Sequence, residues 1–111
     1  MQFSEYETES AQTAIYPGKG EALGLTYAAL GLSGEAGEIA NKAKKVLRDS
    51  GGQLTQQQRD DMAAELGDVL WYVAAVAQEL GVSLSDVAQA NLDKLASRKA
   101  RGTLQGSGDN R

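Results

Sequence analysis

Two pairs of acidic residues, each spaced three positions apart, constrain this 111-residue chain more than any other feature. Glu35 and Glu38 form one pair, and Glu65 and Asp68 form the other. Residues at i and i+3 lie on one face of an α-helix, so two antiparallel helices would direct all four carboxylates into one space. Four carboxylates cannot all stay ionised in a confined site unless cations neutralise them, because like charges raise each other's pKa. Hard divalent ions with oxygen ligands, above all Mg²⁺, fit such a site.

The spacing of apolar residues predicts an all-α protein, because they recur with helical periodicity and no segment alternates with a period of two. Capping boxes place helix starts at Ser4 with Glu7 and at Thr55 with Gln58, and Ser83 with Asp86 caps the last helix. The expected helices cover residues 4–15, 21–48, 55–80 and 83–100. We therefore expect one domain over residues 1–101, followed by a glycine-rich tail over residues 102–111.

Residues 69–77 suggest that the fold needs more than one chain. This stretch is apolar nearly all round, as in a helix that is buried on every side. Four short helices cannot surround it fully, so we expect a second copy to bury it. The fold class predicted from these observations is an all-α four-helix bundle completed by homo-oligomerisation.

Composition excludes several kinds of function. The chain has no cysteine and no histidine, which removes disulfides, thiolate chemistry and imidazole-bound metals. A net charge of −4 argues against a nucleic-acid partner, and no apolar run is long enough to span a membrane. Because residues 1–5 show no signal-peptide pattern, we expect a soluble cytoplasmic protein without a membrane partner.

A polar group interrupts the apolar stripe of the helix expected over residues 83–100. Asn91 falls in the middle of that stripe, with Lys94 and Arg98 flanking it on the same side. A polar side chain on a buried stripe must find a hydrogen-bonding partner. One amide and two cations together suit a phosphate-bearing ligand.

Each of these features also has a purely structural interpretation. An acidic pair on a helix is usually solvated, and Glu38 with Lys42 would form an ordinary ion pair at i and i+4. Asn91 would equally serve a hydrogen bond between helices. A helical interaction module without catalysis explains the apolar residues 69–77. It does not explain why acidic residues border the apolar faces of the helices expected over residues 21–48 and 55–80. A carboxylate-bridged redox or storage centre normally includes histidine ligands, which this chain lacks.

Taken together, the motifs resemble those of a known enzyme family. Residues 34–38 (Gly-Glu-Ala-Gly-Glu) and 65–70 (Glu-Leu-Gly-Asp-Val-Leu) are similar to the E-x-x-E…E-x-x-D pattern of MazG-like all-α nucleoside triphosphate pyrophosphohydrolases. Residues 91–98 are similar to the N-x-x-K-L…R segment of that superfamily. The resemblance covers residues 6–98 and includes the spacing between the motifs.

The resemblance implies hydrolysis of a nucleoside or deoxynucleoside triphosphate between the α- and β-phosphates, giving a monophosphate and pyrophosphate. It implies catalysis with Mg²⁺, or Mn²⁺ as a substitute, held by Glu35, Glu38, Glu65 and Asp68. It further implies a homodimer or a homotetramer. A phosphoribosyl-ATP pyrophosphohydrolase, which has a related helical architecture, is the alternative within the enzyme class.

Charge and position assign the substrate-binding residues. Lys42, Lys94 and Arg98 are candidates to bind phosphate, and Asn91 lies on the same expected helix as the last two. Tyr72 lies one turn beyond the second acidic pair, where its ring would stack on the base or pack near the sugar.

Two interpretations remain open for residues 102–111. Composition favours a frayed, solvated terminus. The segment also resembles the G-x-G-D-x-R ending of a subset of small MazG-like proteins. Gly106 and Gly108 would let backbone amides approach an anion, and Arg111 would add a charge-assisted contact. The hypothesis is that the tail closes over the nucleotide in its own or a neighbouring subunit.

Overall fold

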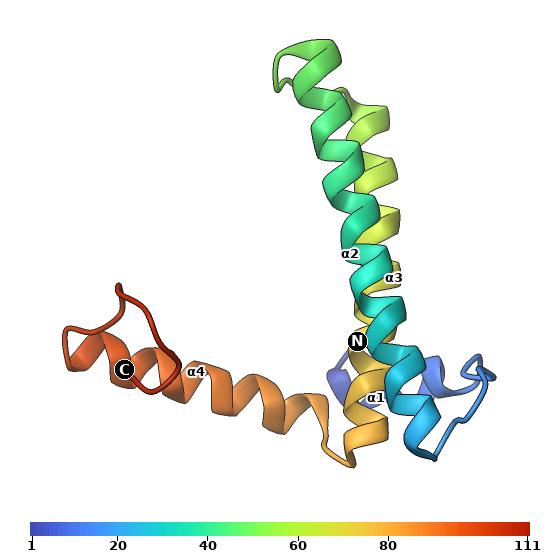
Figure 1. The fold of residues 1–111 in the computed structure, drawn as a ribbon, viewed down its shortest axis with the longest axis vertical. Coiled ribbons are helices and arrows are strands. Elements are labelled where there is room, and N and C mark those ends of the chain that lie inside the picture. Colours follow the sequence, from blue (N-terminus) through green and yellow to red (C-terminus); the bar gives the residue numbers. More distant parts are fainter.

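The computed structural model describes residues 1–111 and consists of four α-helices without any strand (Figure 1). In chain order the helices are α1 (Phe3–Ala11), α2 (Ala22–Ser50), α3 (Gln56–Leu80) and α4 (Leu84–Ala100). The all-α prediction is therefore confirmed. The last three helices begin and end close to the expected residues, whereas α1 ends at Ala11 rather than near Ile15.

The two long helices, α2 and α3, form an antiparallel hairpin whose ends are encoded locally. Gly51 follows α2 and Gly81 follows α3, with φ of 61° and 71°, the left-handed conformation in which glycine commonly ends a helix. Thr55 starts α3 with the predicted capping box. Its hydroxyl accepts a hydrogen bond from the Gln58 amide at 3.1 Å, and its own amide donates to Gln58 Oε1 at 2.8 Å.

The capping box predicted at Ser4 and Glu7 does not form, which corrects the sequence prediction. Gln2 precedes α1, and no side chain caps this helix. The Glu7 carboxylate instead accepts a hydrogen bond from the backbone amide of Leu84, with 2.9 Å between Oε1 and N. The unpaired amides of a first helical turn attract a carboxylate, so Glu7 ties α1 to the start of α4.

The helices do not close into a bundle within one chain. α1 lies against the base of the α2–α3 hairpin, and α4 projects away from it (Figure 1). The radius of gyration is 16.9 Å, whereas a compact domain of this length has one of about 13 Å. Asn91, predicted on a buried stripe, is exposed because no helix packs along that face of α4. No helix combines the length and the apolar character needed to cross a lipid bilayer.

The core of the single chain is small. Only 10 of 111 residues are buried, and the apolar ones other than Val46 form two clusters around the second half of α3. Ala74 and Ala75 are each 5% exposed, so the apolar stretch at residues 69–77 is partly covered by its own chain. Large apolar side chains remain uncovered elsewhere, with Leu66 60% and Leu92 61% exposed. Uncovered apolar surface of this kind is typical of an interaction site.

Glu79, near the end of α3, holds the loop between α1 and α2. Its carboxylate accepts the Tyr16 hydroxyl at 2.5 Å and the Gly20 amide at 3.1 Å. These hydrogen bonds, that of Tyr16 first, keep the pKa of Glu79 below its ordinary value. Burial, and then the hydrogen bond with Glu79, raises the pKa of Tyr16 to about 12. At neutral pH the pair is therefore a phenol and a carboxylate, and it positions Tyr16, the one aromatic residue of the loop.

Glu79→Gln is expected to lower the melting temperature at neutral pH, because an amide accepts weaker hydrogen bonds than a carboxylate. A carboxylate whose pKa is lowered in the folded state stabilises that state above its ordinary pKa of 4.5. This contribution disappears as the pH falls through the lowered value. The difference in melting temperature between wild type and variant should therefore shrink below about pH 4.

Thermal denaturation followed by circular dichroism between about pH 3 and pH 8 measures this difference. Glu21→Gln is the control, since it makes the same change of charge in the same region but the Glu21 side chain forms no capping hydrogen bond. A difference that stays constant over the whole pH range would contradict the role given to Glu79.

Candidate metal centre

The candidate site is built where one face of α2 meets one face of α3. Tyr27, Gly31 and Glu35 follow one another at every fourth position, so they lie along one side of α2. Gly31 faces Tyr72 of α3, because a Cβ atom at residue 31 would overlap the Tyr72 ring. Only a glycine leaves room for the tyrosine between the two helices.

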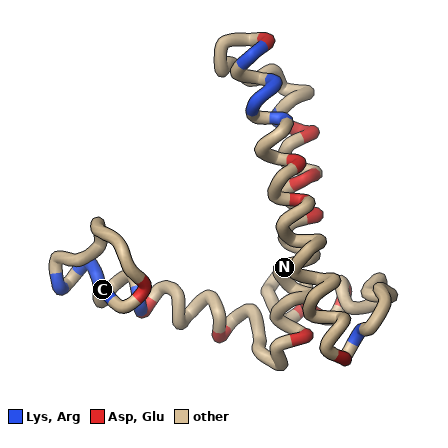
Figure 2. The backbone as a smooth tube through the Cα atoms, in the orientation of Figure 1, with Lys and Arg blue, Asp and Glu red and all other residues tan.

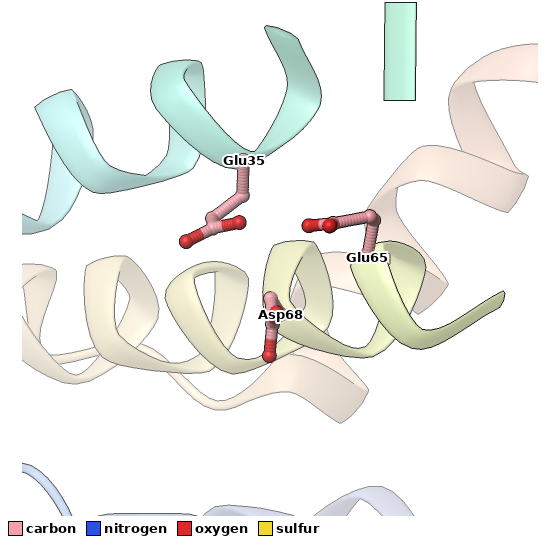
Figure 3. Close-up of side chains that lie close together, drawn as sticks. All are labelled: Glu35, Glu65 and Asp68. Atoms are coloured by element: carbon pink, nitrogen blue, oxygen red, sulfur yellow. The ribbon is translucent and has the colours of Figure 1, made fainter. Parts of the chain in front are cut away.

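Three of the four predicted acidic residues converge beyond that contact (Figure 3). Carboxylate oxygens of Glu35, Glu65 and Asp68 all lie within 4.8 Å of one another. Glu35 of α2 and Glu65 of α3 point toward each other across the space between the helices, and Asp68 lies one turn further along α3. Glu35 and Glu65 are half-buried, whereas Asp68 is exposed. The cluster is thus open to solvent on the Asp68 side.

The cluster carries more negative charge than its surroundings neutralise. Burial, and then the neighbouring carboxylates with Asp68 first, raises the pKa of Glu35 above its ordinary value. The cation that contacts the cluster is Lys42, whose Nζ lies 3.8 Å from Glu65 Oε1. Oxygen-only donors with surplus negative charge fit a hard divalent cation. Glu35, Glu65 and Asp68 are therefore the residues that would hold such an ion.

Glu38, predicted as the fourth ligand, lies beside the cluster rather than in it. Its side chain is exposed, and its carboxylate is not among the three that converge. Its negative charge still helps to raise the pKa of Glu35. A spacing of three residues turns Glu38 about 60° around the helix axis from Glu35, so the two side chains do not face α3 equally.

Tyr72 connects the acidic cluster to a group of aromatic side chains. Burial raises its pKa first, and the nearby Tyr27 hydroxyl and Glu35 carboxylate raise it further. The Tyr72 ring packs edge-on against Trp71 with 5.0 Å between ring centroids, and Tyr16 stacks on Tyr27 with 5.5 Å between centroids. Aromatic faces of this kind suit a planar ligand such as a nucleobase. They border a hollow of about 270 Å³, lined by Thr13, Ile15, Tyr16, Pro17, Tyr27, Trp71 and Tyr72.

Two tyrosines near the acids are absent from the sequence prediction. Tyr27 could have been found from its spacing, because it lies on the same side of α2 as Glu35. Tyr6 of α1 lies near Asp68, since burial and then the charge of Asp68 raise the pKa of Tyr6. No local pattern marks Tyr6, because α1 reaches the cluster only through tertiary packing.

The residues predicted on α4 do not reach the acidic cluster of the same chain. α4 projects away from the hairpin (Figure 1), and Asn91 and Lys94 are exposed. Arg98 is only 7% exposed, and its guanidinium donates to the Asp109 carbonyl at 2.9 Å. One chain therefore brings together Glu35, Glu65, Asp68, Lys42 and Tyr72, but neither Asn91 nor Lys94 nor Arg98.

Comparison with known proteins identifies the family to which the chain belongs. Residues 25–102, from the first turn of α2 to the second residue after α4, match the family model described as the MazG nucleotide pyrophosphohydrolase domain. The chain belongs to the MazG family. The resemblance inferred from the sequence motifs is therefore confirmed. The MazG match includes both acidic pairs and the whole of α4, although these do not meet within one chain.

Two relatives illustrate the extent of the similarity to known proteins. The chain is 59% identical over 114 residues to the gene 37 protein of Mycobacterium phage L5, and the match covers 100% of both proteins. It is 36% identical to YvdC of Bacillus subtilis over 69 residues, which cover 58% of this chain and 65% of YvdC. Neither name states an activity. No solved structure matches the chain significantly.

Glu35→Gln is expected to raise the melting temperature of the metal-free MazG-family protein, because it removes one of three mutually repelling carboxylates. Mg²⁺ should raise the melting temperature of the wild type by binding its folded state, and that of the variant far less. Thermal denaturation in EDTA and in excess Mg²⁺ measures both effects. Asp60→Asn, an exposed acid of α3 outside the cluster, is the matched control. Equal stabilisation of wild type and Glu35→Gln by Mg²⁺ would place the metal elsewhere.

Proposed function

We propose that this MazG-family protein hydrolyses nucleoside or deoxynucleoside triphosphates between the α- and β-phosphates, releasing a monophosphate and pyrophosphate. The observation that carries the proposal is the convergence of Glu35, Glu65 and Asp68 within 4.8 Å. It occurs in a chain whose residues 25–102 match a nucleotide pyrophosphohydrolase domain. Water attack on a phosphoryl group needs charge neutralisation and in-line positioning more than it needs a covalent nucleophile.

The acidic residues take two roles in this proposal. Glu35, Glu65 and Asp68 hold Mg²⁺, or Mn²⁺ in its place, which neutralises phosphate charge and lowers the pKa of a bound water. Glu38 does not belong to the cluster, but its charge acts on Glu35, and in this proposal its carboxylate accepts a proton from the attacking water. Lys42, which borders the cluster, contacts a phosphate in this proposal.

The aromatic hollow supports a nucleoside as the other end of the substrate. It begins at Tyr72, one helical turn from the acids, so a base held there leaves its phosphates near the cluster. Some of the polar groups lining it are already used: Tyr16 donates to Glu79, and Thr13 Oγ1 accepts from Trp71 Nε1 at 2.9 Å. Four of its seven lining residues are aromatic, so we expect stacking to be the main interaction that holds the base, which favours tolerance of several bases.

A homodimer or homotetramer completes the proposed enzyme. Leu66 on α3 and Leu92 on α4 are 60% and 61% exposed, which supports burial of both helices by another copy. In such an assembly Asn91 and Lys94 of one copy would contact the phosphates held by the acids of another. The nucleotide pool is cytoplasmic, so the cytoplasmic location predicted from the sequence stays part of the proposal.

Asp68→Asn is expected to lower turnover at least about 100-fold while helical content stays unchanged, as when one charge-stabilising group leaves an active site. The measurement is release of pyrophosphate and monophosphate, with Mg²⁺, from a panel of canonical and modified dNTPs, NTPs and phosphoribosyl-ATP. Asp60→Asn should keep wild-type turnover.

The panel separates the alternatives. Hydrolysis of phosphoribosyl-ATP alone would favour the phosphoribosyl-ATP pyrophosphohydrolase. No hydrolysis of any substrate by the wild type would favour a helical interaction module. Full turnover by Asp68→Asn would remove the acidic cluster from the mechanism.

Leu92→Glu is expected to dissociate the oligomer into monomers that keep their helical content, because the side chain is 61% exposed in one chain. Ala90→Glu is the matched control, since Ala90 lies on the opposite side of α4. Light scattering at micromolar concentration measures the mass of each. A wild type that is already monomeric would argue against the assembly. Ala74 is unsuitable for this test because it lies in the core of its own chain.

A further inference from the structure

Residues 102–111, called here the C-terminal loop, are folded onto the end of α4 rather than frayed. The Thr103 amide donates to the Arg98 carbonyl at 2.8 Å, which starts the reversal of the chain after Gly102. The Arg111 carbonyl then returns to the helix, where it accepts hydrogen bonds from Arg101 Nη1 at 2.6 Å and from Thr103 Oγ1 at 3.0 Å. The first and last residues of the loop are therefore tied together.

The Arg111 side chain fills the inside of the loop. Its guanidinium donates to the Gly108 carbonyl at 2.6 Å and to the Leu104 carbonyl at 3.3 Å. Gly106 and Gly108 have backbone φ angles of 123° and 95°, which residues other than glycine rarely adopt. These two glycines therefore allow the backbone to wrap around the Arg111 side chain. Arg111 Nε is buried without any hydrogen-bond partner. Arg111 Nε is thus a donor that no acceptor of the protein itself uses.

Arg98 forms the base of the loop. It is the one charged side chain that is buried in this chain, at 7% exposure, and it donates to the Asp109 carbonyl at 2.9 Å. The sequence prediction of Arg98 as a phosphate ligand is thereby revised, because in the structure this side chain anchors the loop.

Two arginines of this unit, Arg98 and Arg111, donate to backbone carbonyls, which are neutral and leave the charge of the guanidinium groups uncompensated. Arg101 donates to the Ser97 hydroxyl and to the main-chain oxygen of Arg111, the last residue of the printed chain. The ion pairs of the chain are Lys42–Glu65 and Arg48–Asp49, both far from this loop in the sequence. Residues 94–111 contain five basic residues and one acid, Asp109. Basic residues gather at the end of α4, whereas acids line the middle of the hairpin (Figure 2).

From this arrangement we infer that the C-terminal loop is a preformed binding unit for the diphosphate part of a nucleotide held at the acidic cluster of a second copy. The inference rests on the proposed function for its substrate. Planar guanidinium groups with unused N–H donors match phosphate oxygens, and holding them on carbonyls orders them before the ligand arrives. The second copy is required because α4 carries the loop away from the acids of its own chain (Figure 1). Arg101 and Arg111 supply the contacts to the anion.

Binding of inorganic pyrophosphate in EDTA tests the loop without catalysis or metal. Isothermal calorimetry compares the wild type with the double variant Arg101→Gln/Arg111→Gln and with Lys99→Gln. Lys99 is an exposed cation of the same helix end that makes no side-chain hydrogen bond or ion pair. The double variant should bind at least about tenfold more weakly, as expected for lost charge-assisted hydrogen bonds, and Lys99→Gln nearly as tightly as the wild type. Equal affinity of the double variant and the wild type would overturn the inference.

Mixed oligomers test whether the loop acts on a second copy. Asp68→Asn and Arg101→Gln/Arg111→Gln are each expected to be nearly inactive, and are co-expressed with different tags. If the site is shared between copies, a mixed dimer holds one intact site, so random mixing restores about one quarter of wild-type activity. Activity no higher than that of the parents would overturn the assignment to a second copy. A wild type without any hydrolase activity would reject the proposed function instead, and pyrophosphate binding would still decide the role of the loop.

Discussion

Repulsion among three carboxylates held between two helices is the constraint on which the rest of this structure depends. Glu35, Glu65 and Asp68 lie within 4.8 Å of one another, with one lysine beside them. Such crowding opposes folding unless a cation offsets it, so the hairpin must be held together by other interactions. Glycine caps, the Thr55 capping box and the close approach at Gly31 supply them. The fold thus maintains a site that is unfavourable until a ligand binds.

The helices of one chain also do not close into a globular unit. Its long helices pair with each other, but α4 leaves the hairpin and most of its apolar side chains stay uncovered. Apolar surface of this extent is rarely left in water. The same geometry separates the acidic hairpin from the basic end of α4 (Figure 2). Association of two copies would bury the apolar surface and bring the opposite charges together, which links assembly to the proposed chemistry.

Hydrogen bonds hold charged side chains in two regions of the chain, with different results. At the C-terminal loop, Arg98 and Arg111 are held by backbone carbonyls rather than by carboxylate side chains, so they are ordered without loss of charge. At the hairpin, Glu79 is used differently: Tyr16 and Gly20 donate to its carboxylate and keep its pKa low, which fixes the aromatic loop. The ionised Glu79 thus serves as a structural anchor, whereas the arginines of the C-terminal loop keep charge that is available for a ligand.

Local patterns were enough to predict the four helices and the Thr55 capping box, because helical spacing and caps depend on neighbours within a few residues. The approach of Glu35 to Glu65 and Asp68, without Glu38, depends on how α2 packs against α3. Tertiary packing decided the rest. Glu7 caps α4 instead of its own helix, and Asn91 is exposed because nothing packs along its face of α4. The Arg98 guanidinium donates a hydrogen bond to the Asp109 carbonyl in the C-terminal loop. These outcomes depend on how α1, α4 and the C-terminal loop pack against the rest of the chain. Contacts between separate elements decide that packing, and local sequence patterns do not reveal it.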